Sequence, residues 1–205
     1  ATVTVTVLPV NDPPQISGSA TLSDTMDEDG TALTFNLSGI NVDDDTFSWQ
    51  VIGGTGTAEV SSTSGTGNLN AEISYTPDAD FNGSDSFQVQ VSDGVYNDSV
   101  TIEITVNPVD DAPRAADDYL VLVPADAALP RLMDVLANDD EVDGQMLQLA
   151  EVGTPTGGGT AVAIVNQLHY TAHLAEGESE TVSYVVSDGV LTDTATLYVS
   201  MVEGV

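Results

Sequence analysis

Carboxylates are the side chains of this sequence with the greatest capacity for chemistry. The 205 residues include 33 Asp and Glu but only two Lys and Arg, for a formal net charge of −31 at pH 7. The acids recur in short runs, among them DEDG at 27–30, PDAD at 77–80, VDD at 109–111 and NDDEVDG at 138–144. Two carboxylates about 4 Å apart repel each other by about 4 kcal/mol at an effective dielectric constant of about 20. Acids that fold into one cluster therefore need a cation between them.

The charge and the missing residue types exclude several classes of function. Because the chain is strongly negative, it would repel the phosphate backbone of a nucleic acid. We therefore expect no nucleic-acid partner. The sequence has no cysteine, which excludes disulfides, thiolate metal sites and cysteine nucleophiles. It has no apolar run long enough to span a bilayer, so we expect no membrane insertion.

Motifs for catalysis are missing as well. The sequence contains neither G-x-S-x-G nor a phosphate-binding loop. His169 and His173 are four residues apart, and on a strand this spacing is about 13 Å, too far for the two side chains to share a metal ion. We therefore expect that the protein is not an enzyme.

Alternating apolar and polar residues predict the strands that must position the acids. In TIEITV at 101–106 the apolar side chains recur at every second position, which is the period of a half-buried strand. Phe47 and Trp49 alternate in the same way and are expected in the core. We predict no amphipathic helix and, in the first unit, strands near 15–22, 31–37, 46–52, 57–61, 71–76, 85–92 and 98–106.

Three internal matches in the same order indicate that one unit is copied. They pair PVNDPP at 9–14 with PVDDAP at 108–113, VSDGVYND at 91–98 with VSDGVLTD at 186–193, and VDDDTFSW at 42–49 with VDGQMLQL at 142–149. Prolines make the acidic runs stiff connectors. Short strands and a turn about every ten residues favour an all-β protein with two tandem Ig-like antiparallel β-sandwich domains stacked end to end. The expected domains are 1–10 (the last strand of a preceding, truncated repeat), 11–107 (sandwich 1), 108–113 (acidic-proline linker) and 114–205 (sandwich 2).

An odd number of strands decides which acidic loops meet. With seven strands the chain enters a unit at one end, here called the leading end, and leaves at the other, the trailing end. The trailing end of the first unit, the linker and the leading end of the second unit would contribute Glu28, Asp78, Asp80, Asp110, Asp111, Asp139, Asp143 and Asp188. The leading end of the first unit would contribute Asn11, Asp12, Asp43, Asp45 and Asp93. Six to eight irregularly placed oxygen ligands suit Ca²⁺ better than Mg²⁺, so both sets are predicted to bind calcium.

The layout resembles cadherin repeats and, more closely, the cadherin-like tandem repeats of large secreted bacterial adhesins, including RTX-type ones. NDDEVDG, YTPDADFNGSDSF at 75–87 and two copies of SDG carry this resemblance. It implies calcium between successive repeats, at positions similar to Glu28, Asp78, Asp80, Asp110, Asp111, Asp143 and Asp188. It also implies a monomeric, secreted, cell-surface protein whose partners are the neighbouring repeats of the same chain, with cell-surface glycans or proteins as further partners in adhesion or biofilm formation.

The second unit departs from this pattern at its trailing end. It has ADAA at 125–128, with Asp126 but no Glu, where the first unit has DEDG. Its later loop, AEGESETVSY at 175–184, lacks the Asp-x-Asp and resembles VCBS-type repeats of the same adhesins. We therefore expect no full calcium site at that end.

Alternative interpretations remain open. Any single Asp in SDG or PDAD commonly caps a turn through its own backbone. NDDEVDG starts like an EF-hand loop, but Ala150 stands at its twelfth position and no helices flank it. The loops at 53–70 and 153–160 could bind a carbohydrate or protein partner, which would make the chain a binding module. The acidity could also be an adaptation to high salt.

Overall fold

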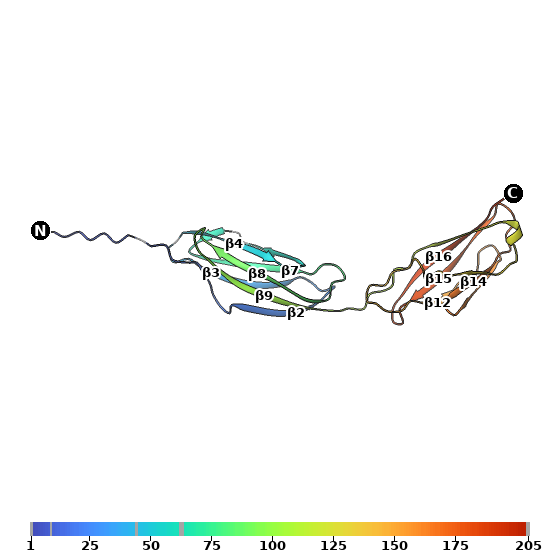
Figure 1. Cartoon of the computed structure of the whole chain (residues 1–205), viewed down its shortest axis with the longest axis horizontal. Helices are drawn as coiled ribbons and strands as arrows, with labels where there is room; N and C mark the ends of the chain where they lie inside the picture. Colours follow the sequence, from blue (N-terminus) through green and yellow to red (C-terminus); the bar gives the residue numbers. More distant parts are fainter. Residues whose placement is uncertain (1, 9, 44, 62–63, 204–205) are drawn as a thin grey trace. The chain divides into compact units, whose positions relative to one another are not determined.

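Strands make up nearly all the regular structure of this chain (Figure 1). The computed structural model describes residues 2–8, 10–43, 45–61 and 64–203. The chain divides into two compact units, unit 1 (residues 1–109) and unit 2 (residues 110–205), which are described separately below. Among the described residues, no helix is long and apolar enough to cross a membrane. The predicted all-β class with two tandem domains is confirmed.

Unit 1 is a sandwich of two sheets. One sheet has the strand order β1-β3-β7-β5 and the other has the order β2-β9-β8-β4-β6. The strands are β1 (Gln15–Ile16), β2 (Thr21–Asp27), β3 (Leu33–Ile40), β4 (Thr46–Gly53), β5 (Thr57–Val60), β6 (Ser64–Thr66), β7 (Asn68–Thr76), β8 (Gly83–Ser92) and β9 (Asn97–Asn107). Neighbouring strands are antiparallel except β2, which runs parallel to β9.

The strand predicted over residues 15–22 is wrong in one respect, because it is two strands in different sheets. β1 pairs with β3, whereas β2 pairs with β9. Between them, Gly18 has a φ of +117°, a conformation that glycine adopts far more readily than other residues. The passage of the chain from one sheet to the other does not change the apolar alternation, because the chain is extended on both sides of Gly18.

The segment 53–70, treated above as a possible binding loop, is mostly strand. It contains β5, β6 and the first residues of β7, and β6 pairs with β4. Ala58 and Val60 on β5 pack against the core, which holds this part of the chain in the sheet. Residues 62 and 63 lie outside the described residues. The segment is therefore not a free loop on the surface of the sandwich.

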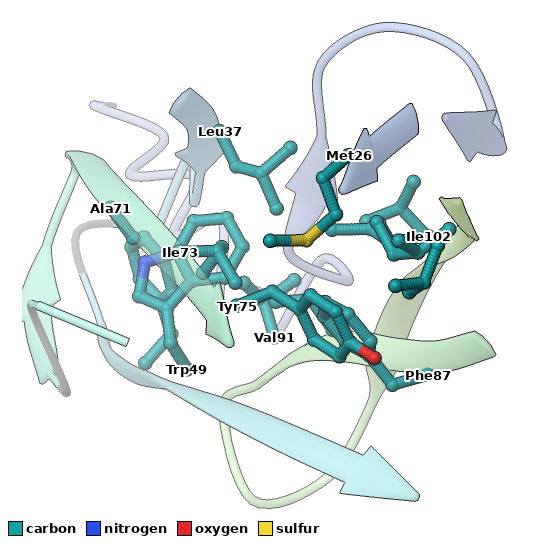
Figure 2. Close-up of a cluster of buried hydrophobic side chains, with 14 residues drawn as sticks. Met26, Leu37, Trp49, Ala71, Ile73, Tyr75, Phe87, Val91 and Ile102 are labelled. Carbon is teal, nitrogen blue, oxygen red and sulfur yellow. The ribbon is translucent and has the colours of Figure 1, made fainter. Parts of the chain in front are cut away.

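Aromatic side chains fill the core between the two sheets of unit 1 (Figure 2). Phe47 and Trp49 on β4 are buried, with exposed fractions of 1% and 4%, as their alternation predicts. Tyr75 on β7 stacks on Phe87 on β8, with ring centroids 5.6 Å apart. Because β7 and β8 belong to different sheets, this stack joins the two layers.

We expect Gly39→Ala to destabilise unit 1 by about 1–2 kcal/mol, within the usual cost of overpacking a core. A Cβ at Gly39 would lie 2.8 Å from ring atoms of both Phe47 and Trp49, so the rings would have to shift. Urea unfolding followed by the fluorescence of Trp49, the single tryptophan of the chain, measures the effect. Thr34→Ala, at an exposed position of the same strand, is the control. Equal stability of both variants would contradict the tight contact.

Unit 2 repeats the sandwich with seven strands. Its sheets have the orders β10-β16-β15-β12 and β11-β14-β13. The elements are β10 (Asp118–Leu122), the 3-10 turn η1 (Pro124–Asp126), β11 (Arg131–Met133), β12 (Gln148–Val152), β13 (Thr160–Ile164), β14 (Gln167–Thr171), β15 (Ser179–Ser187) and β16 (Thr192–Met201). The first strand, β10, again runs parallel to the last, β16. Leu168, Tyr170, Val182, Tyr184 and Leu197 are among its fully buried core side chains.

The segment 1–10, predicted as the last strand of a preceding repeat, forms no strand in its described residues 2–8 and 10, and residues 1 and 9 lie outside the described residues. Val3, Val5 and Val7 have exposed fractions of 84%, 78% and 85%. A strand needs a hydrogen-bonded neighbour, and no strand of unit 1 pairs with these residues. That they belong to a preceding repeat stays a prediction.

Each unit contains a buried carboxylate that accepts a hydrogen bond from the hydroxyl group of a tyrosine ten residues earlier in the sequence. Asp85 is 8% exposed and accepts hydrogen bonds from the Tyr75 hydroxyl (2.8 Å) and from the backbone N–H of Thr55 (2.9 Å), Gly56 (3.0 Å) and Ser86 (2.8 Å). In unit 2, Glu180 accepts bonds from the Tyr170 hydroxyl and from the N–H of Gly157 and Gly159. Each pair therefore fixes a glycine-rich loop to the core.

Acid is expected to weaken unit 1 through Asp85. Burial raises the pKa of Asp85, but the hydrogen bonds from Gly56, Tyr75, Thr55 and Ser86 together outweigh it and lower the pKa below its ordinary 3.8. Because the folded pKa is the lower one, this contribution to stability is complete above about pH 4 and is lost as the pH falls further. Urea unfolding at several pH values below 4 checks the slope. An equally steep slope for Asp85→Asn would contradict this assignment.

Candidate functional site

Strand register brings the acids of unit 1 to its trailing end. β2 ends opposite Asn107, the last residue of β9, so the turn that carries Glu28 lies where the chain leaves the unit. β8 begins opposite Val106, so the loop with Asp78 and Asp80 lies at the same end. Parallel pairing of the first and last long strands thus produces the grouping that strand counting predicts.

Glu28 attaches the start of the linker to unit 1. Its side chain is 6% exposed, its Oε1 accepts the Val109 N–H at 2.7 Å and its Oε2 accepts the Asn82 Nδ2 at 3.4 Å. Asn82, in the loop that also carries Asp78 and Asp80, thus donates a side-chain hydrogen bond to Glu28. The backbone is held up to Val109, the residue before Asp110.

The leading end of unit 1 brings together the predicted residues of its own set. The N–H of Asp12 donates to Asp43 Oδ2, and the Asn11 Nδ2 donates to Asp93 Oδ2 at 3.0 Å. A hollow of about 300 Å³ lies here, lined by Val10, Asn11, Asp43 and Asp45. Asn11 Oδ1 is shielded from water and has no donor among the described residues. Three of the predicted ligands, Asn11, Asp43 and Asp45, therefore line one small space.

Asp93 is ionised at this end. Its Oδ1 accepts the N–H of Val95 and of Tyr96, both at 2.7 Å. Hydrogen bonds from Tyr96 and Val95, with a smaller one from Asn11, lower the pKa of Asp93. The carboxylate therefore both closes the turn of SDG and keeps its negative charge.

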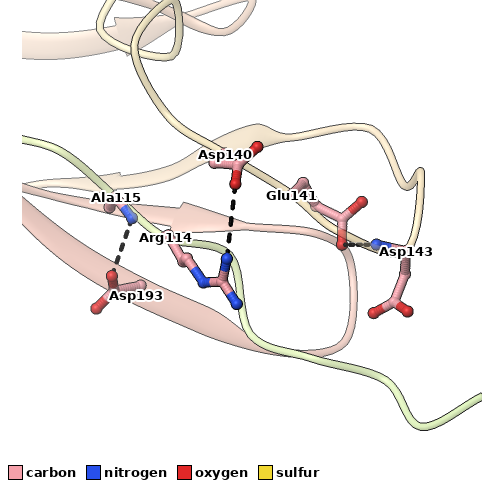
Figure 3. Close-up of polar contacts among 6 residues, drawn as sticks. All are labelled: Arg114, Ala115, Asp140, Glu141, Asp143 and Asp193. Atoms are coloured by element: carbon pink, nitrogen blue, oxygen red, sulfur yellow. Dashed lines mark hydrogen bonds and ion pairs between the residues drawn. The ribbon is translucent and has the colours of Figure 1, made fainter. Parts of the chain in front are cut away.

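Unit 2 repeats this arrangement at its leading end. The N–H of Asp111 donates to Asp143 Oδ2 at 2.8 Å, as that of Asp12 does to Asp43. Glu141 orders the loop around Asp143, because its carboxylate accepts the N–H of Asp143 at 3.0 Å (Figure 3) and of Gln145 at 2.5 Å. The two copies thus use the same contact, between the linker and the loop that precedes β4 in unit 1 and β12 in unit 2.

The end of the linker and the first residues after it, up to Ala116, are attached to the rest of unit 2 by several contacts. Gln145 Nε2 donates to Asp110 Oδ1. The N–H of Ala115 donates to Asp193 Oδ2 at 2.9 Å and that of Ala116 to Asp139 Oδ1 at 2.8 Å. Figure 3 shows Arg114 reaching Asp140, an exposed ion pair at 3.7 Å that contributes little to stability.

Four oxygens at the leading end of unit 2 lack a donor. They are shielded from water and have no hydrogen-bond partner among the described residues: Asp110 Oδ2, Asp139 Oδ2, Gln145 Oε1 and Asp188 Oδ2. Each of these four side chains uses its other polar atom in a hydrogen bond within the unit. Since buried polar atoms normally have partners, these acceptors are atoms that a bound cation or water molecule could satisfy.

These oxygens come from segments that the sheet brings to one end. Gln148, the first residue of β12, lies opposite Ser187 at the end of β15, so the loop that contains Asp139 and Gln145 adjoins the turn that contains Asp188. Asp188 is only 8% exposed. Carboxylate and amide oxygens are the ligands that calcium prefers, so the donor set fits this ion.

Repulsion among the acids of unit 2 is visible in their pKa values. Burial raises the pKa of Asp139, and nearby Asp118 and Asp193 add to it, against the opposing effect of the Ala116 hydrogen bond. Burial also raises the pKa of Asp118, with help from Asp117 and Asp134, although the Tyr184 hydroxyl opposes it. Burial, with smaller contributions from neighbouring acids, therefore favours the neutral form of Asp139, and a cation beside it would favour the charged form.

The trailing end of unit 2 is built differently. Asp126, in η1, forms an ion pair with Arg131 at the start of β11. An Asp that is already neutralised by an Arg is a poor ligand for a cation. The expectation that this end lacks a full calcium site stays a prediction, and the ion pair agrees with it.

Sequence reasoning missed several residues that organise these ends. Asn82 and Gln145 are amides, whereas all the predicted ligands except Asn11 are acids. Glu141 is one of the acids of NDDEVDG, and its carboxylate accepts two backbone N–H groups of its own loop. The Tyr75–Asp85 and Tyr170–Glu180 pairs were missed as well, although their equal spacing of ten residues in both repeats is a usable signal.

The family comparison covers both units. The model of the bacterial Ig domain (Big_9) matches residues 11–106 and again residues 110–200. No curated protein matches the chain.

Three solved structures illustrate a distant resemblance to the chain. An endo-fucoidan hydrolase of glycoside hydrolase family 107 is 16% identical over 94% of this chain, with a TM-score of 0.41, and the chain spans 29% of that protein. Drosophila N-cadherin EC1-4 is 15% identical over 93% of this chain and 50% of its own, with a TM-score of 0.44. The titin domains Z1Z2 are 11% identical over 96% of this chain and all of their own, with a TM-score of 0.34. Likenesses this distant carry no information on function.

Proposed function

Because the chain belongs to the bacterial Ig domain family, with one domain in each unit, we propose that it is a pair of calcium-dependent extender modules of a secreted cell-surface adhesin. Bacterial Ig domains are typically extracellular surface modules. In this proposal calcium binds where one module meets the next and makes the tandem array rigid, so that a distant binding domain is presented for adhesion or biofilm formation. The modules act as monomers and perform no catalysis of their own.

The donor-free oxygens at the leading end of unit 2 carry the proposal. Asp110 Oδ2, Asp139 Oδ2 and Asp188 Oδ2 are carboxylate oxygens, and Gln145 Oε1 is an amide oxygen. A single water molecule has only two protons to donate, whereas a divalent cation can satisfy several oxygens and reduce the repulsion between the acids. Calcium at this end would be bound in part by Asp110, which belongs to the linker.

Attachment of the linker on both sides explains how bound calcium could stiffen the chain. The Val109 N–H is held by Glu28 within unit 1, and the Asp111 N–H is held by Asp143 within unit 2. Only Asp110 stands between these two attachments. A cation bound to Asp110 would therefore restrain the short stretch of chain between these two attachments. The RTX-type assignment, with a VCBS-like second unit, is part of this proposal and is supported by the motifs NDDEVDG and SDG.

Spin labels or dyes on two introduced cysteines test the proposal, and the chain offers a clean background because it has no cysteine. Gln88→Cys in unit 1 and Val162→Cys in unit 2 are at exposed strand positions. We expect the distribution of distances between the labels to narrow with calcium and to broaden with a chelator. Sodium chloride at matched ionic strength should not narrow it, which separates calcium binding from adaptation to salt.

Matched variants identify the ligands. Asp139→Asn and Asp188→Asn keep the oxygen that accepts the backbone N–H groups but replace the second oxygen with an amino group. In the double variant, calcium should no longer narrow the distribution of distances between the labels. In the control Glu72→Gln, at an exposed position of β7, calcium should still narrow it. The proposal is overturned if calcium leaves the distance distribution unchanged in the labelled chain that keeps Asp139 and Asp188.

A further inference from the structure

A stacked pair of tyrosines lies exposed on the outer face of the β10-β16-β15-β12 sheet. Tyr119 on β10 is opposite Tyr198 on β16, with ring centroids 5.3 Å apart and ring planes at 14°. Their exposed fractions are 72% and 42%. Neither ring contributes to the core cluster of unit 2, so the pair has no structural task inside the sandwich.

A hollow of about 360 Å³ adjoins the rings. Side chains with hydroxyl groups line it. They are Thr156, in the loop between β12 and β13, Ser179 and Thr181 on β15, and Ser200 on β16. Glu180 is the one charged residue among its described lining residues, and its carboxylate accepts hydrogen bonds from groups of the unit itself. In a chain with a net charge of −31, this surface is uncharged.

Unit 1 has the same hollow without the tyrosines. It measures about 320 Å³ and is lined by residues that include Ser84, Ser86 and Glu103. Glu103 is 95 positions before Tyr198, which is the offset of the VSDG repeat. The strand partner of Glu103 is Ser23, whereas that of Tyr198 is Tyr119. The fold therefore does not require tyrosines here, and the difference is specific to unit 2.

From this difference we propose that the hollow beside Tyr119 and Tyr198 binds an uncharged saccharide, and that unit 2 alone has this site. A sugar ring presents C–H groups on its face, which pack on the electron-rich face of an aromatic ring. Its hydroxyl groups can exchange hydrogen bonds with Thr and Ser side chains beside the ring. Pockets that combine a few apolar groups with well-placed polar ones are typical of small-ligand sites.

Other occupants fit less well. An anionic sugar or peptide would be repelled by the charge of the chain, and no basic side chain lines the hollow. A proline-rich peptide docks into slots between aromatic rings, but these two rings stack on each other at 5.3 Å and leave no slot. A second copy of the chain would bring two charges of −31 together.

Titration calorimetry of the whole chain with soluble polysaccharides tests the proposal. The probes are a β-1,3-glucan, a β-1,4-linked glucan oligosaccharide, a mannan and a galactan, with alginate as the anionic comparison. We expect at least one uncharged probe to bind and alginate not to bind. The double variant Tyr119→Ser with Tyr198→Glu, which copies the residues of unit 1, should weaken binding about tenfold or more. Because both tyrosines are exposed, its melting temperature should stay close to that of the parent chain.

The reverse exchange makes the test independent of folding defects in unit 2. Ser23→Tyr with Glu103→Tyr, added to the double variant, should restore binding through unit 1. Tyr96→Ser, an exposed tyrosine in another part of unit 1, should leave binding unchanged. The proposal is overturned if no uncharged probe binds, if alginate or a proline-rich peptide binds at the tyrosines instead, or if the double variant binds as well as the parent.

Discussion

Replacing Asp85 with alanine is expected to destabilise unit 1 by about 3–5 kcal/mol, the usual cost of removing one partner from a buried charged network. The side chain accepts hydrogen bonds from Thr55, Gly56, Tyr75 and Ser86. Without it these donors would remain buried and unsatisfied, which costs about 1–3 kcal/mol for each fully buried group. Urea unfolding followed by Trp49 fluorescence reports on unit 1 alone, because this single tryptophan lies in its core.

The repeat supplies controls for this experiment. Ser86→Ala changes only an exposed side chain next to Asp85 and should alter stability by about 0.5 kcal/mol or less. Glu180→Ala removes the equivalent carboxylate of unit 2, so it should leave the Trp49 transition in place and lower the melting temperature of the other unit. A loss below about 1 kcal/mol for Asp85→Ala would mean that water replaces the carboxylate.

Calcium is expected to raise the melting temperature of unit 2 by about 10–20 °C. Extracellular calcium modules have dissociation constants of about 10⁻⁴ to 10⁻³ M. At about 10 mM calcium, a site at the tighter limit is about 100-fold above its dissociation constant and gains about 2.7 kcal/mol. For a domain of about 100 residues each kcal/mol shifts the melting temperature by about 4–8 °C. Scanning calorimetry with calcium and then with a chelator measures the shift.

Two comparisons distinguish calcium binding at this site from a general effect of salt. Asp139→Asn with Asp188→Asn should lose most of the shift, because these residues supply two of the four donor-free oxygens. Sodium chloride at the same ionic strength should produce only a small shift. If sodium chloride stabilises unit 2 as strongly as calcium does, the acidity is an adaptation to salt and the calcium site fails.

Much of the fold could be predicted from periodicity. Phe47 and Trp49 are two positions apart in a strand and both are in the core, and the repeated motifs gave the two units. The break at Gly18 could not be predicted, because the chain is extended on either side of it and alternation gives no information about which sheet a strand joins. The short strand β6 was missed for a related reason. Its residues, SGT, have no apolar alternation, and pairing with β4 alone makes them a strand.

The candidate site was predictable at the level of loops but not of atoms. Counting strands placed Glu28 and Asp143 in the correct turns, since this needs only the direction of each strand. The distances depend on side-chain conformations that no spacing reveals. Glu28 therefore emerges as an acceptor for the Val109 N–H, and an amide, Gln145, contributes one of the donor-free oxygens.

The parallel pairing of first and last strands determines how each unit would respond to tension. Seven residues of β2 are paired with β9 and five of β10 with β16, with the two strands running in the same direction. Pulling on the two ends of such a unit loads its terminal hydrogen bonds in shear, so that they must break together rather than one after another. Under such a load, seven paired residues of β2 would have to separate together in unit 1 and five of β10 in unit 2.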